Sequence, residues 1–149
     1  MLTSKGKYGL KALVHLAEHE GQGSSLIAEI AANNNIPKKF LDAILLDLKN
    51  AGFLSSKKGR GGGYSLARPA NRIFIGDVIR VLDGPLAPIP CASRTAYRRC
   101  DDCRDTSICR IRSLMLDVRD AIAEILDRTT LADLRGRTAS AEVVLLYDI

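Results

Sequence analysis

Apolar residues recur every three or four positions along the first part of the chain, which is the spacing of an amphipathic helix. This pattern predicts a first helix over residues 8–19, ended by a Gly- and Ser-rich break. It predicts a second, shorter helix over 26–33. Ser24 or Ser25 is the expected N-cap residue, because a serine hydroxyl accepts a hydrogen bond from the first helical turn.

A third helix and a hairpin are predicted next. Proline is tolerated at the start of a helix, and Pro37 opens an apolar pattern that runs to about Asn50. Two short extended segments, 53–56 and 64–66, flank a basic, glycine-rich tip, which predicts a β-hairpin. Helix, helix, turn, helix and basic hairpin are the element order of a winged helix-turn-helix, whose later helix enters the DNA major groove.

The second half of the chain predicts more helix and one irregular segment. A short helix is expected over 76–82, and three prolines within 84–90 indicate a linker. A long helix is expected over 111–126 and a last helical turn over 130–134. The tail after Gly136 carries no firm expectation. The whole pattern predicts a mainly α fold with a small β-hairpin wing and a long C-terminal helix.

Basic residues are concentrated in the front half, although the net charge is only +5. Residues 1–65 hold nine Lys and Arg against five Asp and Glu, whereas residues 90–149 hold ten of each. A basic face favours a polyanion such as nucleic acid as partner. The chain start lacks the apolar core of a signal peptide, and no apolar run reaches the length of a membrane span. A cytoplasmic protein without a membrane partner is therefore expected.

The predicted third helix and wing carry the basic residues that would meet DNA. Lys38 and Lys39 lie at the N-terminal end of the helix, where free N–H groups and the helix dipole also favour phosphate. In the wing, Lys58 and Arg60 precede three consecutive glycines, which let backbone N–H groups approach phosphates without a Cβ in the way. Arg60 is the strongest candidate for groove insertion, because a guanidinium can bind phosphate or guanine through two donors.

Enzymatic chemistry is not indicated. The wing lacks the Gly-Lys-Ser/Thr ending of a phosphate-binding P-loop, which disfavours nucleotide hydrolysis. No Ser-His-Asp set or pair of carboxylates suggests a catalytic centre, and no small-molecule substrate is expected. His15 and His19 are four residues apart on the first helix. A surface or half-buried structural role is favoured for them over a metal site.

The four cysteines fall within one short segment, residues 91–109. They are Cys91, Cys100, Cys103 and Cys109. A Cys-x-x-Cys pair reaches one metal, and four thiolates complete a metal site. An iron–sulfur cluster is the first interpretation, with structural zinc or a metal-free thiol–disulfide sensor as alternatives. Simple buried cysteines are disfavoured because the segment is polar, and its arginines are expected to lower the pKa of the thiols.

Five stretches of the chain form a distinctive set, which lies at residues 2–8, 36–41, 48–54, 59–64 and 76–79. The most specific feature is the wing sequence Gly-Arg-Gly-Gly-Gly-Tyr followed downstream by a cysteine group. In these stretches the sequence resembles the Rrf2 family of bacterial regulators, which includes the IscR and NsrR types. The resemblance covers about residues 1–134.

The resemblance implies a homodimeric winged-helix repressor or activator that binds a palindromic operator in double-stranded DNA. The long helix would form the dimer interface, and a cluster beside it would sense iron, cluster supply, oxidants or nitric oxide. The implied domains are a winged helix-turn-helix over 1–83, a linker and sensor loop over 84–110, a dimerisation helix over 111–134 and a tail over 135–149. DNA contacts are expected from family position and from charge at Thr3, Ser4, Lys5, Tyr8, Lys38, Lys39, Phe40, Lys58, Arg60, Gly61, Gly62, Gly63 and Tyr64.

The cysteine spacing departs from the family pattern. Cluster-binding members show three cysteines about five residues apart, and here Cys103 and Cys109 keep that gap while Cys91 lies farther upstream. Arg112 stands where the IscR type has a histidine. The additional Cys100 is therefore expected to be the fourth ligand, which gives an all-cysteine site within one subunit.

Two other classes of protein stay open. One is a thiol-redox or electron-transfer protein whose basic half docks an acidic partner, and the other is a zinc-stabilised interaction module. The thiol-redox or electron-transfer protein does not need a glycine-rich wing or a helix opened by proline. Those two features therefore favour the DNA-binding regulator.

Overall fold

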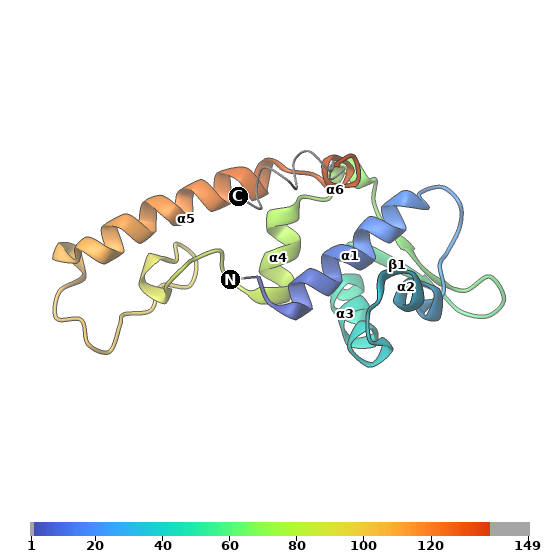
Figure 1. Cartoon of the computed structure of the whole chain (residues 1–149), viewed down its shortest axis with the longest axis horizontal. Coiled ribbons are helices and arrows are strands. Elements are labelled where there is room, and N and C mark those ends of the chain that lie inside the picture. The colour runs from blue at the N-terminus through green and yellow to red at the C-terminus, as the bar shows by residue number, and fades with distance from the viewer. Residues whose placement is uncertain (1, 138–149) are drawn as a thin grey trace, which may run out of the picture.

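The computed structural model describes residues 2–137 as a helical body from which one long helix extends (Figure 1). The α-helices are α1 (Ser4–Glu18), α2 (Ile27–Asn34), α3 (Lys38–Asn50), α4 (Ile75–Asp83), α5 (Arg110–Arg128) and α6 (Leu131–Arg135). The strands β1 (Leu54–Lys57) and β2 (Gly63–Leu66) form one antiparallel hairpin. Three short 3₁₀ turns are η1 (Ala70–Arg72), η2 (Pro90–Ala92) and η3 (Thr106–Ile108). The predicted mainly α fold with a hairpin wing is confirmed.

Two details at the helix starts differ from expectation. Helix α1 begins earlier than predicted because the Thr3 hydroxyl accepts a hydrogen bond from the Gly6 amide and caps the helix. The prediction that Ser24 or Ser25 caps α2 is wrong. The N-cap residue is Leu26, without a side-chain cap, and the backbone of Ser25 pairs with Tyr64 through two hydrogen bonds of 2.8 Å. That pairing attaches the hairpin to the start of α2.

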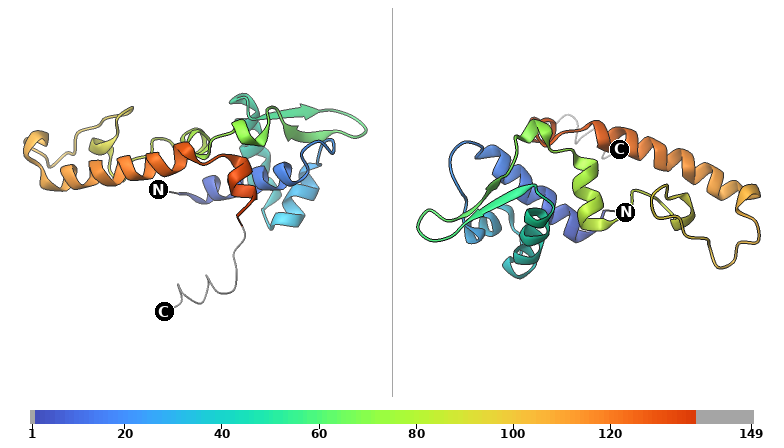
Figure 2. Two further views of the ribbon diagram at one scale, coloured as in Figure 1. Left: turned by 90° about the horizontal axis from the view of Figure 1, so that it is seen from above. Right: turned by 180° about the vertical axis from the view of Figure 1, so that it is seen from behind.

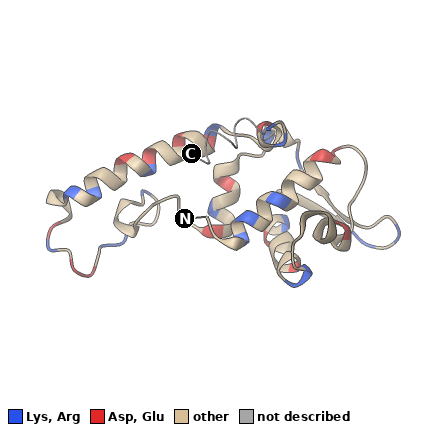
Figure 3. Ribbon diagram, viewed as in Figure 1, with Lys and Arg blue, Asp and Glu red and all other residues tan. Residues whose placement is uncertain are grey.

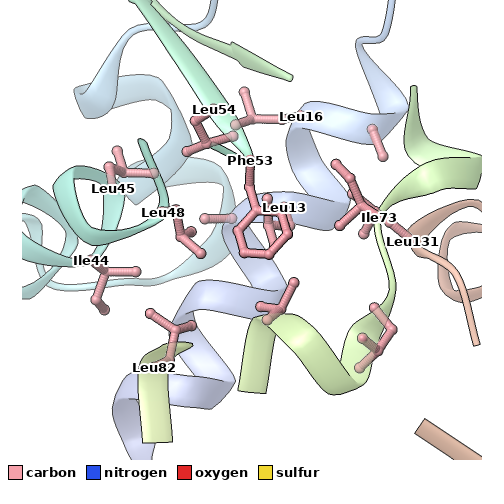
Figure 4. Close-up of a cluster of buried hydrophobic side chains, with 14 of the residues drawn as sticks. Leu13, Leu16, Ile44, Leu45, Leu48, Phe53, Leu54, Ile73, Leu82 and Leu131 are labelled. Carbon is pink, nitrogen blue, oxygen red and sulfur yellow. The ribbon is translucent and has the colours of Figure 1, made fainter. Parts of the chain in front are cut away.

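The hydrophobic core lies where α1, α3, α4 and β1 meet (Figure 4). Leu13 of α1 and Leu45 and Leu48 of α3 are fully buried there. Leu131, at the start of α6, is also fully buried, so the last helix packs against α1 and closes the same core. Burying side chains of this size stabilises the fold by about 1.5–3 kcal/mol each. The core therefore anchors the buried face of α3 and leaves the opposite face of the helix exposed.

Helix α5 extends beyond the body and is attached to it at its C-terminal end (Figures 1 and 2). The Arg80 guanidinium of α4 donates two hydrogen bonds, of 2.7 and 2.9 Å, to the Asp127 carboxylate of α5. These bonds hold the pKa of Asp127 below its usual value. A Cβ at Gly76 would meet the Asp127 carboxylate at 1.9 Å, so the glycine leaves this side chain room to bond Arg80.

Short backbone pairings complete the attachment of α5 and α6. The Ile75 amide donates to the Thr129 carbonyl at 2.9 Å, and the Leu131 amide donates to the Ile73 carbonyl at 2.7 Å. A capping box between Thr130 and Asp133 then starts α6. None of the helices in the described part of the chain combines the length and apolar character that crossing a bilayer requires. The predicted tail, 135–149, lies almost entirely outside the described residues.

Candidate nucleic-acid interface and cysteine loop

The N-terminal turn of α3 is presented to solvent. Pro37 is its N-cap residue in an extended conformation, and Lys38, Lys39 and Phe40 directly after it are all exposed. Phe40 has 56% of its surface exposed. The charged and apolar side chains predicted to contact DNA therefore project from the end of a helix whose opposite face is anchored in the core.

A groove on one side of α3 joins two predicted segments that are far apart in sequence. It has a volume of about 540 Å³ and brings the start of α1 against the start of α3. Its lining residues are Ser4, Lys5, Tyr8, Lys39, Phe40, Ala43 and Ile44. Lys5 also forms an ion pair of 2.8 Å with Asp47 of α3. Five of the predicted DNA-contacting residues are thus gathered around one groove.

Thr3 was predicted to contact DNA and already has partners within the protein. Its hydroxyl accepts from the Gly6 amide and donates to the Asp83 carboxylate, and its backbone amide donates to the same carboxylate at 3.1 Å. These bonds tie the first turn of α1 to the end of α4. Contact of Thr3 with DNA stays a prediction, and the structure gives the residue a capping role.

A second groove lies between α3, the start of α2 and the wing, which is formed by β1, β2 and the turn between them. It has a volume of about 560 Å³. Lysines, wing glycines and the residues at the start of α2 line this groove. The lining residues are Leu26, Ile27, Ala28, Lys38, Lys49, Ser56, Lys57, Lys58, Gly59, Gly62, Gly63 and Tyr64. The sequence analysis missed the residues at the start of α2, because the Ser25–Tyr64 pairing that brings them to the wing joins residues far apart in the sequence.

The wing glycines have structural roles besides those expected. The Gly62 amide donates a 2.9 Å hydrogen bond to the Gly59 carbonyl, so it is engaged within the turn. A Cβ at Gly63 would meet the Ser25 carbonyl oxygen at 2.1 Å, and the φ of this residue is +126°. Gly63 is therefore required for the wing to pair with α2. Arg60 lies exposed at the turn between two glycines of positive φ, Gly59 and Gly61.

The positive charge is distributed accordingly (Figure 3). Lysines and Arg60 are found on α1, the ends of α3 and the wing, whereas acidic and basic residues alternate along α5. Lysines line both grooves beside the exposed helix, which suits a polyanionic ligand.

The segment with the four cysteines, residues 91–109, is here called the cysteine loop, and it runs beside the first half of α5 (Figure 2). All four cysteines are free and line one cavity of about 320 Å³. The Sγ atoms of Cys91 and Cys100 are 3.7 Å apart. Cys109 is the N-cap residue of α5, where its Sγ accepts a hydrogen bond from the Arg112 amide at 3.4 Å. The structure thus brings the four predicted ligands to one place.

Two expectations about the cysteines are wrong. Cys91 is buried, with 3% of its surface exposed, because η2 packs it against α5. The pKa of Cys100 is raised, not lowered, first by the hydrogen bond to the Cys91 sulfur and then by desolvation and nearby negative groups. Arg99, one of the arginines expected to lower it, instead donates to the backbone carbonyls of Cys103 and Arg104.

Arg112 has a role that the sequence analysis did not assign to it. Its Nε donates to the Cys91 carbonyl at 3.0 Å, while its guanidinium lies 5.7 Å from the centre of the Tyr97 ring. A second arginine, Arg94, forms two hydrogen bonds of 2.8–2.9 Å with Asp120 and lowers the pKa of that carboxyl to about 2. The cysteine loop is therefore bonded to α5 at several points along the helix.

The donor set fits a thiolate-bound metal group in part. Two thiolates on one tetrahedral ion, with metal–sulfur bonds of about 2.3 Å, stand about 3.8 Å apart. The Cys91–Cys100 distance of 3.7 Å matches this value. Cys103 and Cys109 lie farther from this pair. Among the described residues, no three cysteine sulfurs lie within 4.8 Å of one another. The loop thus presents one preformed pair and a second pair on the same cavity.

Comparison with known proteins gives consistent matches. The family model described as "Rrf2: Iron-dependent Transcriptional regulator" matches residues 2–137. A protein of Rhodobacter capsulatus named as an HTH-type transcriptional regulator, rrf2-like, is 45% identical over 137 residues, covering 90% of this chain and 91% of its own length.

Solved structures agree with these sequence matches. The structure of CymR, the global cysteine regulator of B. subtilis, has a TM-score of 0.77 at 35% identity, over 93% of this chain and 98% of that one. The structure of IscR from T. potens has a TM-score of 0.72 at 29% identity, over 97% and 96% of the two chains. The named relatives are transcriptional regulators and not enzymes, as expected.

Proposed function

Because the chain belongs to the Rrf2 family of transcriptional regulators, we propose that it is a homodimeric, sequence-specific DNA-binding regulator controlled by its cysteine loop. It would act in the cytoplasm on a palindromic operator. The observation that carries the DNA-binding part is the placement of α3. Its N-terminal turn projects Lys38, Lys39 and Phe40 between two grooves lined by lysines.

We infer that α3 enters the major groove and that the wing follows the backbone or the minor groove. The four lysines of the second groove are positioned to neutralise phosphates, and such contacts supply affinity without reading sequence. Arg60 extends this basic edge at the exposed turn of the wing. Base reading then falls to the exposed start of α3, where the helix is narrow enough for the groove.

Operator selection from random-sequence duplexes, with the full-length protein, tests this function directly. The enriched sequences are expected to contain an inverted repeat with half-sites roughly 10 bp apart, because a twofold dimer places two recognition helices about one helical turn apart. A pool that shows no enrichment over several rounds would refute sequence-specific binding.

On the selected operator, Arg60→Ala is expected to weaken binding by about 5- to 150-fold, the effect of losing a contact of about 1–3 kcal/mol. The slope of log affinity against log salt should fall by about one if Arg60 binds phosphate. Fluorescence anisotropy across a salt series measures both quantities. Arg128→Ala is the matched control, because that arginine is exposed on α5 away from the wing, and equal losses in the two variants would contradict the assignment.

Dimerisation is proposed through α5. The helix carries a stripe of exposed apolar side chains at three- and four-residue spacing, which includes Ile111, Leu114, Val118 and Ile125. Such a stripe needs a partner surface, and a second copy of the same helix provides a matching one. Acidic and basic residues beside the stripe suit pairing of a helix with its own copy.

The cysteine loop is proposed as the sensor, with Cys91, Cys100, Cys103 and Cys109 as ligands of an iron–sulfur cluster. A bound cluster supplies four iron–thiolate bonds and a group whose redox state and stability depend on iron and oxidants. The chain's own residues transmit the loop state. Cys109 caps α5, and Arg112 and Arg94 bond the loop to that helix. Reordering the loop would therefore shift the start of α5, and with it the spacing of the two recognition helices.

Anaerobic purification with iron, sulfide and zinc analysis and a visible spectrum tests the sensor. The native protein is expected to hold iron and sulfide, and Cys100→Ala is expected to lose most of both because Cys100 forms the close pair with Cys91. Unchanged loading in Cys100→Ala would show that Cys100 is not a ligand. If the native protein is colourless and holds stoichiometric zinc, and if Cys100→Ala loses that zinc, the cysteine loop binds zinc in place of an iron–sulfur cluster.

The Cys91–Cys100 pair also supports a second candidate, a metal-free thiol sensor. At 3.7 Å the two sulfurs are close enough to form a disulfide after a small movement, when an oxidant such as a peroxide accepts the two electrons and two protons that the thiols lose. The raised pKa of Cys100 slows its reaction as a thiolate. In that case the anaerobic protein contains neither iron nor cysteine-bound zinc.

A further inference from the structure

The two histidines of the chain lie together with a glutamate from another helix. His15 and His19 are on α1, and Glu29 is on α2, the first helix of the helix-turn-helix unit. One ring nitrogen from each histidine and one carboxylate oxygen of Glu29 are within 4.8 Å of one another. The imidazole rings stack with their centres 4.5 Å apart. Folding thus brings a carboxylate, which is a third potential metal ligand, to two histidines that are four residues apart in the sequence.

His15 has an unmet bonding requirement inside the protein. Its side chain is buried, with 3% of the residue exposed, and its Nε2 has no hydrogen-bond partner among the described residues. Leaving a buried polar atom unpaired costs about 1–3 kcal/mol. The other ring nitrogen, Nδ1, lies 3.1 Å from the Asn34 side-chain amide. The described protein groups therefore leave Nε2 of this imidazole without a partner.

His19 is oriented as a metal-binding histidine is. Its Nδ1 lies 2.8 Å from the His15 backbone carbonyl, so Nδ1 carries the proton and Nε2 keeps its lone pair. A carbonyl that accepts from the far ring nitrogen is the usual partner of a ligating imidazole.

We propose that His15, His19 and Glu29 form a binding site for a divalent transition-metal ion, with zinc as the best match. Two imidazole nitrogens and one carboxylate oxygen form a three-residue ligand set, and water takes the fourth position. Ligand atoms about 2.1 Å from a tetrahedral ion are about 3.4 Å apart, so atoms now within 4.8 Å of one another would approach by up to about 1.4 Å, and the exposed Glu29 side chain is able to move.

Binding has two further structural consequences. For His15 to ligate through Nε2, its Nδ1 must carry the ring proton, so the Asn34 amide turns its oxygen towards Nδ1 and gives up its 2.8 Å bond to the Ile30 carbonyl. The ion would also join α1 directly to α2 and so stiffen the unit that positions α3. This site is separate from the cysteine loop, and the proposal does not depend on the function of that loop.

Imidazole ¹⁵N NMR of the full-length protein tests the site, because only two histidines contribute signals. Added zinc chloride is expected to shift the Nε2 resonances of both rings together, whatever zinc the cysteines take up. Magnesium chloride should shift neither, since magnesium prefers oxygen ligands. Zinc that moves only one ring, or neither ring, would overturn the proposal.

Matched variants on exposed positions complete the test. Glu29→Gln is expected to weaken zinc binding at the histidines by at least about tenfold, the loss found even for supporting groups around a metal. Glu18→Gln, which removes an exposed carboxylate from α1 outside the cluster, should leave that affinity unchanged. Equal affinities in the two variants would remove Glu29 from the site and contradict the three-residue set.

Discussion

Replacing Leu114 with arginine is expected to separate the dimer into monomers and to lower operator affinity by about 100- to 10,000-fold, the gain that linking two binding modules usually gives. Leu114 belongs to the exposed apolar stripe of α5 and has 57% of its surface exposed. In a dimer the arginine would bury an unpaired charge against its own copy, which the interface cannot accommodate. Sedimentation and operator titration measure the two effects together.

Ser113→Arg is the control for this prediction, because it adds the same charge at the neighbouring exposed position of α5. It is expected to remain dimeric and to keep most of the operator affinity. The helix content of Leu114→Arg should equal that of the native chain, since Leu114 does not belong to the core of the monomer. A dimeric Leu114→Arg protein would place the interface somewhere other than on this stripe.

Truncating Leu48 to alanine is expected to lower the free energy of unfolding by about 2–5 kcal/mol. Leu48 is fully buried on the inner face of α3, where it packs into the core behind the recognition surface. A domain of this kind is stable by only about 5–15 kcal/mol, so this single truncation removes a large share. Urea unfolding at a fixed protein concentration, without metal, provides the measurement, with a midpoint expected about 1 M lower or more.

Leu46→Ala provides the comparison within the same helix, because Leu46 has 49% of its surface exposed. Its unfolding free energy is expected to change by no more than about 0.5 kcal/mol. The two variants make the same chemical change to α3, so they separate burial from helix propensity. Similar losses for both would mean that α3 is not anchored by this core.

Local signals in the sequence were sufficient for most of the fold. The periodicity of apolar residues predicted each of the helices within a few residues, since a side chain that must be buried repeats with the helix turn. Pro37 and the glycine-rich tip located the start of α3 and the hairpin for equally local reasons. The sequence also identified the basic residues of α3 and the wing, and the cluster of cysteines.

Other features required contacts between distant residues. The pairing of Ser25 with Tyr64 attached the wing to α2, and it gave Gly63 a steric role that no local pattern indicates. The tertiary structure also brought Cys100 within hydrogen-bond distance of Cys91, and that bond raises the pKa of Cys100, which the neighbouring arginines in the sequence were expected to lower. Sequence neighbours do not decide which charges a thiol faces.

The sequence by itself determined the order of the elements, the family resemblance and the division into a basic half and a cysteine-bearing half. Only the tertiary structure decided which groups share a site. It brought Lys5 to the groove that Lys39 and Phe40 of α3 also line, and it brought Glu29 to His15 and His19. The physical reason is that periodicity reports which face of each element is buried, whereas the packing of one element on another sets the distances on which binding chemistry depends.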